Sequence, residues 1–458
     1  MKIVICGAGQ VGFSIARQLS MEGNDITVID TSPDLIRRIN DNLDAQGVIG
    51  HASRPDVLDR AGTADADMII AVTLADEVNM VACQVAHSIF EVPMKIARVR
   101  EQSYLDPAWS KLFSKDHLPI DVIISPEVEV ARAIVRRLRV PGSFEMIPLA
   151  NDKVRLLGVH VDEACPLIRT PIKQLTQLFP QLNMIIVGIL RGDRPVYVSG
   201  EDELQIGDDV YFVVESEQVP RAMAAFGHEE PEPKRLLTCG GGNIALQLAQ
   251  DIERDFAWIN AKIIEADAER AAVIASVLNS TVVLHGDVLD PEILEEAGVA
   301  TTDTVVAVTD DDETNILTSI LAKRYGAKRS IALLNKATYE PLVGNLGIDV
   351  VVSPRNITAS TILQHVRRGS IHSVHRLREG FGEVIEAEAL ETSSLVGAPL
   401  REVKLPAGVM VGAIVRGGEV ITPRGTTTIQ PKDRVVLFAS VEAVRKVEKL
   451  FSVRIEYF

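Results

Sequence analysis

The chain has 458 residues, of which 47% are hydrophobic and 24% are charged, and its formal net charge is −16. This length predicts three or four globular domains that can bury their cores without disulfides or metals. The acidic balance excludes nucleic acid as a partner, because a nucleic-acid binder needs basic surface to displace counterions, and it argues against direct insertion into an anionic lipid leaflet.

Two features of the sequence indicate a cytoplasmic protein. The cysteines favour reduced thiols over a disulfide framework or a zinc site, since none of them form a C-x-x-C pair. They are Cys6, Cys83, Cys165 and Cys239. The N-terminal apolar run is too short for a signal peptide, and no window approaches the ~18 apolar residues of a membrane helix. Docking onto a membrane protein stays open.

Residues 1–139 alternate short apolar runs with longer amphipathic segments. The predicted strands are 2–6, 26–30, 46–49, 68–72, 95–99 and 121–124. The predicted helices are 10–21, 33–43, 55–61, 77–90, 103–114 and 127–138. Because the strands read as near-continuous isoleucine and valine runs, we expect a parallel sheet with helices on both faces.

The pattern changes after residue 139. Residues 140–227 contain short alternating runs broken by RGD and GDD, which predict a small α+β domain built on hairpins. The segment 228–234, HEEPEPK, contains three glutamates and two prolines. We expect it to form an extended, solvated linker.

The second half of the chain repeats the first. Gly240 aligns with Gly7 at an offset of 233 residues, and further blocks follow in the same order. They pair 26–30 with 261–265, 68–80 with 304–316, 93–100 with 328–335, 120–127 with 348–355, 185–196 with 411–421 and 203–214 with 428–439. The preserved order of these blocks indicates a domain duplication.

The predicted fold class is therefore α/β, with two tandem Rossmann-like parallel-sheet domains, each followed by a small α+β domain. The expected boundaries are 1–139 and 140–227 for the first pair, 228–234 for the linker, and 235–367 and 368–458 for the second pair. We also expect fragments 1–229 and 232–458 to fold separately.

The first glycine turn has the pattern of a dinucleotide-binding site. Gly7-x-Gly9-x-x-Gly12 follows a predicted strand and opens a predicted helix. These glycines permit a tight turn, close approach of a pyrophosphate and close helix packing, and the helix N-terminus attracts phosphate. Asp30 ends the next strand, where a carboxylate binds the ribose hydroxyls and repels a 2′-phosphate, so NAD(H) is favoured over NADP(H). The alternative is a tight turn without a ligand.

The second glycine turn is less regular. It keeps Gly240 and Gly242, but Ala245 replaces the third glycine and Glu265 replaces the aspartate. Alanine is tolerated at the third place, because that position needs only a small side chain. Three aspartates at 310–312 either raise the negative potential near the ligand or favour the start of the next helix.

No catalytic group accompanies the two turns. Arg98 lies at the end of the fifth predicted strand, where it can reach a phosphate or stack on adenine. The alternative is a solvated arginine without a ligand. In the second half, Leu333 takes its place. A dehydrogenase needs a proton donor or acceptor beside the nicotinamide. The nine histidines form no such constellation, so an NAD-dependent oxidoreductase is the alternative to a non-enzymatic sensor.

Several longer motifs make the pattern more specific. In the first half they are MKIVICGAGQVG, NDITVID, DADMIIAVT, DEVNMVACQVA and IARVR. In the second half they are GGGNI, AVTDDDETNI and LAKRYGAK. Through these motifs the chain resembles, over essentially its whole length, the regulatory subunits of bacterial Trk potassium-uptake systems, which are tandem RCK (regulator of potassium conductance, or KTN) proteins.

The resemblance implies a protein that binds NAD(H), with ATP or ADP as further ligands, forms a tetrameric ring and gates a membrane-embedded Trk potassium transporter. It implies a first site made of Gly7, Ala8, Gly9, Gln10, Val11, Asp30, Thr73, Leu74 and Arg98. The second would be made of Gly240, Gly241, Gly242, Asn243, Ile244 and Glu265. Ala245 departs from the family's pattern of a third glycine, which puts tight ligand packing at the second site in doubt, and Leu333 removes the arginine there.

Overall fold

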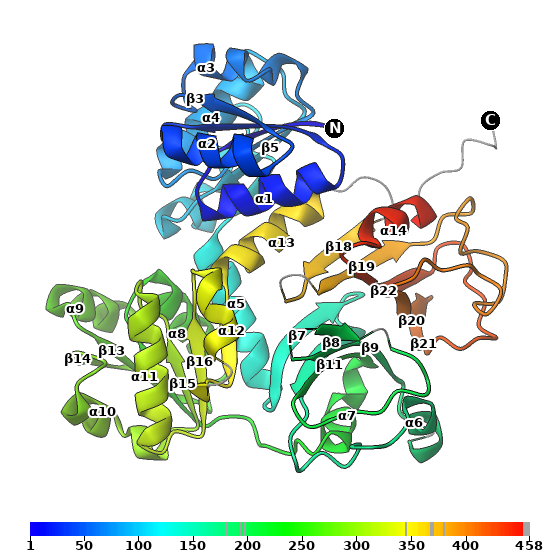
Figure 1. Ribbon diagram of the computed structural model, residues 1–458. Helices are drawn as coiled ribbons and strands as arrows, with labels where there is room; N and C mark the ends of the chain where they lie inside the picture. The colour runs from blue at the N-terminus through cyan, green and yellow to red at the C-terminus, as the bar shows by residue number, and fades with distance from the viewer. Residues whose placement is uncertain are drawn as a thin grey trace. The chain divides into compact units, whose positions relative to one another are not determined.

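The computed structural model describes residues 1–451 except 180, 193, 197, 344–345, 367–370 and 379–380. The chain divides into two compact units. The first contains Met1–Val130 and Ser353–Val366, and the second contains the rest of the described chain. In Figure 1 the first unit is the blue-to-cyan domain together with the yellow helix α13.

The first unit is built on a six-stranded parallel sheet. Its strands are β1 (Lys2–Cys6), β2 (Asp25–Asp30), β3 (Gln46–Ile49), β4 (Met68–Ala71), β5 (Met94–Arg98) and β6 (Val122–Ile124). They lie in the order β3-β2-β1-β4-β5-β6, and all six predictions are confirmed to within one residue at each end. The order reverses between β1 and β4, which is where a doubly wound sheet has its ligand crevice.

Helices cover both faces of this sheet. They are α1 (Gln10–Met21), α2 (Pro33–Asn42), α3 (Pro55–Arg60), α4 (Asp76–Ser88) and the start of α5 (Pro126–Arg139). The helix predicted over 103–114 is wrong, because the 3-10 turns η2 (Gln102–Leu105) and η3 (Pro107–Phe113) lie there. Asp106 accepts a hydrogen bond from the Ala108 N–H at 2.8 Å, and together with Pro107 it starts a new turn instead of continuing the previous one.

A helix from the second repeat completes the first unit. α13 (Pro354–Val366) packs along α1, as Figure 1 shows, and its apolar residues lie in the same core as Ile15 and Leu19 of α1. The buried residues of α13 are Ala359, Ile362, Leu363 and Val366. A segment of the second repeat therefore helps to build the core beneath the first glycine turn.

The second unit contains another parallel sheet of the same order, β14-β13-β12-β15-β16-β17. Its strands are β12 (Arg235–Cys239), β13 (Asn260–Glu265), β14 (Val282–His285), β15 (Thr304–Ala307), β16 (Arg329–Leu333) and β17 (Val350–Val352). Its helices are α8 (Asn243–Asp255), α9 (Ala268–Val277), α10 (Pro291–Ala297), α11 (Asp312–Arg324) and α12 (Glu340–Val343). The matching order of the two sheets confirms the predicted pair of Rossmann-like domains.

Two antiparallel sheets also belong to the second unit. The first contains β7 (Ser143–Leu149), β8 (Val154–His160), β9 (Met184–Arg191), β10 (Arg194–Val196) and β11 (Asp208–Glu215), with α6 (Ile172–Leu178) and α7 (Val219–Ala225). The other contains β18 (Ile371–Arg376), β19 (Gly382–Glu388), β20 (Val409–Arg416), β21 (Glu419–Ile421) and β22 (Arg434–Ser440), with α14 (Val444–Phe451). The hairpins β9–β10 and β20–β21 confirm the predicted α+β character. The remaining 3-10 turns are η1 (Thr63–Asp65), η4 (Ser216–Gln218), η5 (Val299–Thr301) and η6 (Ala337–Tyr339).

The two antiparallel sheets share one core. Tyr211 of the first sheet lies between Phe144 and Phe381, with ring centroids 5.4 Å and 5.1 Å away, and Phe381 also contacts Phe438 at 4.9 Å. A hydrogen bond of 2.9 Å from the Ala150 N–H to the Glu386 carboxylate joins the sheets as well. Both this core and the core around α13 draw residues from both halves, which argues against the expectation that the two halves fold separately.

Candidate nucleotide-binding site

The first glycine turn connects β1 to α1 at the crevice. Gly7 has a φ of +108°, a backbone conformation that side chains disfavour, and a Cβ added there would lie 3.0 Å from the Val72 carbonyl oxygen. A Cβ on Gly12 would lie 1.8 Å from the Gly7 carbonyl oxygen. The first and third glycines of the motif are therefore required for the close packing of turn, helix and neighbouring strand, as predicted.

The middle of the turn faces open space. A Cβ on Gly9 would meet no atom within 4 Å, and within the described structure no side chain caps α1 at Gly9. The first amides of α1, which belong to Gln10 and Val11, therefore have no intrahelical partner and none from a capping side chain. Such an uncapped helix start, with its partial positive charge, fits a phosphate group.

Asp30 holds the turn in shape. Its Oδ2 accepts a hydrogen bond from the Ala8 N–H at 2.7 Å, and its Oδ1 accepts one from the Ser32 N–H at 2.8 Å. An ionised carboxylate has about four lone-pair positions, so both oxygens keep capacity for a further donor. The side chain predicted to bind ribose is thus also the group that joins the glycine turn to the end of β2.

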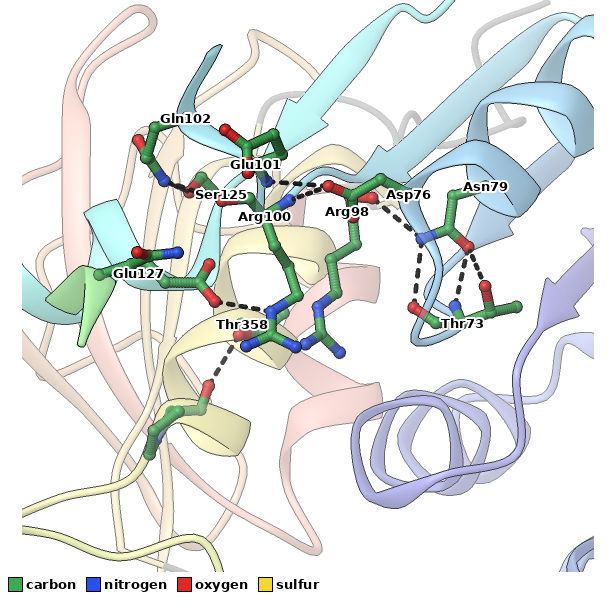
Figure 2. A network of polar contacts seen from close by, with 12 residues as sticks. Thr73, Asp76, Asn79, Arg98, Arg100, Glu101, Gln102, Ser125, Glu127 and Thr358 are labelled. Atoms are coloured by element: carbon green, nitrogen blue, oxygen red, sulfur yellow. Dashed lines mark hydrogen bonds and ion pairs between the residues drawn. The ribbon is translucent and has the colours of Figure 1, made fainter. Parts of the chain in front are cut away.

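A buried asparagine organises the other side of the crevice (Figure 2). The Asn79 Oδ1 accepts hydrogen bonds from the N–H and the hydroxyl of Thr73, at 2.8 Å and 2.7 Å. Its Nδ2 donates to the Arg98 carbonyl at 2.9 Å. Asn79 is fully buried and ties the end of β4 to the end of β5. This asparagine was not predicted as a site residue, although the pattern DE-x-N recurs in both halves as DEVN and DETN.

Asp76 fixes the loop that follows β5. Its Oδ2 accepts the N–H groups of Arg100 and Glu101, both at 2.8 Å. The Arg100 Nε in turn donates to the Glu127 carboxylate at 2.8 Å. Figure 2 shows the guanidinium groups of Arg98 and Arg100 pointing the same way from this loop and strand end.

Arg98 fits a role in anion binding better than that of a solvated arginine. Burial, followed by the nearby positive charge of Arg100, lowers the pKa of its guanidinium. Its Nε is buried and has no hydrogen-bond partner in the described part of the chain. A buried donor without a partner is costly, and a phosphate oxygen is a group that would satisfy it. Leu74, in contrast, is 83% exposed. Its predicted contact with the nucleotide would be made by an apolar side chain that faces solvent.

The second turn reproduces the same geometry in the second unit. Gly240 has a φ of +98°, and a Cβ on Gly242 would meet nothing within 4 Å. Ala245 is fully buried, so this turn accommodates the methyl group that the first turn has no room for. As at α1, no side chain in the described structure caps α8, whose first residues are Asn243 and Ile244.

The acid and the asparagine also have counterparts. Glu265 accepts the Gly241 N–H at 2.5 Å and the Asp267 N–H at 2.8 Å, as Asp30 does in the first half. The Asn315 amide accepts the Thr309 N–H at 2.8 Å and donates to the Leu333 carbonyl at 3.0 Å. The framework around both turns is therefore the same, down to single hydrogen bonds.

Two of the three aspartates at 310–312, Asp311 and Asp312, have structural roles. The Asp311 Oδ1 accepts the Thr314 N–H at 2.7 Å and caps α11. The carboxylate of Asp312 accepts the N–H groups of Asn335 and Lys336, both at 2.8 Å. The Asp311 contact supports the second of the two interpretations, that the acids favour a helix start, whereas Asp312 holds the loop after β16. Leu333, at the position that matches Arg98, is buried and carries no charge.

Cys6, Cys239 and the histidines at 365, 372 and 375 add no reactive group to the turns in the described structure. Cys6 and Cys239 are fully buried, and burial raises the pKa of each thiol to about 12, which keeps both protonated. His365 lies on α13, whereas His372 and His375 lie on β18, so the three do not share a helix face. No group of three metal-ligating side chains occurs among the described residues.

The domains match known family models in the same duplicated order. The TrkA-N domain matches residues 3–126 and 236–354, and the TrkA-C domain matches residues 156–227 and 384–452. The Trk system potassium uptake protein TrkA of Azorhizobium caulinodans is 52% identical over 458 residues, which is 100% of both chains. This chain belongs to the TrkA family of Trk potassium uptake proteins. The TrkA of Halomonas elongata is 40% identical over 462 residues, again with 100% of both chains covered.

Solved structures support the same architecture for this TrkA-family chain. The GsuK RCK domain superposes with a TM-score of 0.60 at 18% identity, covering 99% of this chain and 95% of that chain. The GsuK channel bound to NAD superposes with a TM-score of 0.59 at 18% identity, covering 99% and 79%. At such identities the likeness shows the fold alone. In the part of the TrkA-family chain that the structure describes, no helix is both long and apolar enough to span a bilayer.

Proposed function

We propose that this chain is a nucleotide-binding regulatory subunit of a Trk-type potassium uptake system. The observation that carries the proposal is the pair of matching glycine turns, each with an uncapped helix start and an acid bonded to the turn, in a member of the TrkA family. Each turn offers phosphate-binding amides and a carboxylate for ribose.

The first turn is proposed to bind NAD(H). Asp30 would accept the ribose hydroxyls, the first amides of α1 would donate to the pyrophosphate, and Arg98 would reach a phosphate or stack on the adenine. The full proposed set is Gly7, Ala8, Gly9, Gln10, Val11, Asp30, Thr73, Leu74 and Arg98. NAD is the ligand of the GsuK channel structure, whose fold this chain shares.

The second turn is proposed to bind a related nucleotide, NAD(H) or ATP or ADP. Its set is Gly240, Gly241, Gly242, Asn243, Ile244 and Glu265. Because Leu333 replaces the arginine, the second turn has a different charge on its β15–β16 side. ADP is the ligand of another GsuK structure. Two turns of different composition would let one chain respond to two nucleotide signals.

Regulation follows from binding without turnover. A ligand that binds one conformation more tightly shifts the population toward that conformation. The size of the shift is set by the difference in the ligand's affinity for the two conformations, and this shift is what a bound partner would respond to. The partner we propose is the membrane-embedded Trk potassium transporter, with this chain as a cytoplasmic homo-oligomer, a tetrameric ring, docked on its inner face. The chain would be a sensor and not an enzyme.

Valine at the centre of each turn tests the proposal. Gly9→Val and Gly242→Val place a side chain where the pyrophosphate must approach, yet both positions have ordinary φ values and open space, so the fold should persist. We expect calorimetry with NADH and ATP on the full chain to lose one binding event per variant. Potassium uptake by cells at limiting potassium should change, with transporter abundance unaltered.

A matched control is Gly425→Val, which alters a loop glycine outside both turns, where a Cβ would be 3.5 Å from the Arg401 Cβ. It should leave binding and uptake as in the wild type. If both turn variants bound nucleotides normally, or lost binding with no change in uptake, the proposal would be wrong. Reduction of NAD by the purified chain with a candidate substrate would favour the oxidoreductase alternative instead.

A further inference from the structure

The clearest difference between the two turns lies beside the ribose acid. Five residues after each acid, on the first turn of the next helix, the first half has Leu35 and the second has Arg270. The Arg270 Nε donates to the Gly241 carbonyl at 2.9 Å, and its Nη2 donates to the Asn243 side-chain oxygen at 3.0 Å. Arg270 therefore lies across the second glycine turn.

This arginine is held in place by its own helix. The Arg270 N–H donates to the Asp267 carboxylate at 2.7 Å, which caps α9 and fixes the start of the helix over the turn. A guanidinium has five N–H donors, so three remain after its two side-chain bonds. In the described part of the chain no carboxylate forms an ion pair with Arg270. Its charge and its three remaining donors are thus available beside the ribose position.

The charges around the two acids differ accordingly. Asp30 has the apolar Leu35 at the matching place, and the arginine one turn further along α2, Arg38, stacks on the Phe13 ring at 4.2 Å. In the described structure, the polar contacts of the Asp30 carboxylate are with backbone N–H groups and include no cation. In the second turn Arg270 brings a positive charge to Gly241, the residue whose N–H group Glu265 accepts.

The residue at the end of the neighbouring strand is also more polar in the second half than in the first. His285 ends β14 opposite Glu265, and its ring nitrogen contacts the Ala266 carbonyl at 3.1 Å. Ile49 ends β3 opposite Asp30 in the first half. Two polar nitrogen-bearing side chains therefore flank the second acid where two apolar ones flank the first.

We propose that Arg270 is a specificity-determining residue that lets the second turn accept an adenosine phosphorylated on its ribose 2′-hydroxyl. The first turn would reject the same ligand, because Asp30 repels a 2′-phosphate and Leu35, at the place of Arg270, supplies no positive charge. A fork of guanidinium donors is suited to a phosphate group, to which it binds in a bidentate manner. The inference rests on the proposed function, since it assumes that both turns bind adenosine.

NAD and NADP are the right probes, because they differ only in the 2′-phosphate. The full-length Gly9→Val variant reports on the second turn, and Gly242→Val reports on the first. With calorimetry we expect NADP to bind the second turn at least as tightly as NAD, and to bind the first turn at least about tenfold more weakly than NAD, because of the like charge of Asp30.

Exchange of the two side chains tests the role of Arg270 itself. In the Gly9→Val background, Arg270→Leu should weaken NADP by about tenfold and leave NAD within about threefold. Leucine is the residue of the first half at this place, so the fold should tolerate it, and circular dichroism checks that it does. Leu35→Arg in the Gly242→Val background should strengthen NADP at the first turn.

The outcomes separate the two ideas. If NAD binds the second turn and NADP does not, or if Arg270→Leu weakens both equally, the inference is overturned and the proposed function stands. If Arg270→Leu weakens ATP and ADP but not NADP, the arginine reads the 5′-phosphates and the inference is also overturned. If neither turn binds any of these nucleotides, the proposed function fails first.

Discussion

The two glycine turns share their backbone framework and differ in the side chains that line it. In both, an acid bonds to the second residue of the turn, and a buried asparagine joins the ends of two strands. The first half has Arg98 where the second has Leu333, and the second half has Arg270 where the first has Leu35. These exchanges change the charge on opposite sides of the crevice. After the duplication the scaffold stayed the same, while the side chains that would read a ligand diverged.

The largest expected effect comes from separating the halves. Fragment 1–229 lacks α13, so the apolar face of α1 that includes Ile15 and Leu19 becomes exposed. Fragment 232–458 lacks Tyr211, which packs on Phe381, and Phe144, which packs on the other side of Tyr211. We expect each fragment alone to aggregate and the two together, when co-expressed, to form a soluble complex, as size-exclusion chromatography would measure. Two monodisperse, separately folded fragments would show that the shared cores are dispensable.

The third position of each turn provides a sharper comparison. Gly12→Ala puts a methyl group 1.8 Å from a backbone oxygen, so the turn or α1 must shift, at about 3 kcal/mol in the free energy of unfolding. Ala245→Gly should cost only about 1 kcal/mol, through lost helix propensity. Urea unfolding followed by circular dichroism measures both. Similar values for the two would mean that the turns pack alike despite their different residues.

Much of this arrangement was predictable from the sequence, and the reasons for the failures are physical. Short apolar runs located the strands of the first sheet, because a parallel strand buried on both faces is apolar throughout. The position of α13 was missed, since periodicity shows that a helix has an apolar face but not which core buries it. Arg270 was missed because its role depends on where α9 begins relative to the turn.

The buried asparagines test the part that both turns share. Asn79→Ala would leave the Thr73 N–H and the Arg98 carbonyl without this partner, and Asn315→Ala would do the same to Thr309 and Leu333. Each change should cost about 2 kcal/mol of unfolding free energy, because the groups left behind are partly or fully buried. Chemical denaturation measures the loss, and the exposed Asn42→Ala should change stability little. If only one of the two substitutions lowered the free energy of unfolding strongly, the two asparagines would not have equivalent structural roles.

The smallest expected effect is an acid-sensitive contact that the first half lacks. The Glu253 carboxylate of α8 accepts the N–H groups of Asn279, Ser280 and Thr281, at 3.0, 2.8 and 2.8 Å. Its partial burial by itself would raise the pKa, but these hydrogen bonds lower the pKa from 4.5 to about 2. In the first half Ser20 occupies the matching place on α1.

Because the folded protein holds this pKa below that of the unfolded chain, the stabilisation is present above about pH 5 and is lost as the pH falls toward 2. Water screens this partly exposed group, so we expect only about 1 kcal/mol at neutral pH. Glu253→Gln should therefore lower the urea midpoint at pH 7, and the difference from the wild type should shrink below about pH 4.5 and close as the pH approaches 2. Glu296→Gln, at an exposed position on α10, serves as the control and should follow the wild type throughout. A constant difference between Glu253→Gln and wild type from pH 7 to pH 3 would mean that the amide contacts stabilise α8 without any contribution from the carboxylate charge.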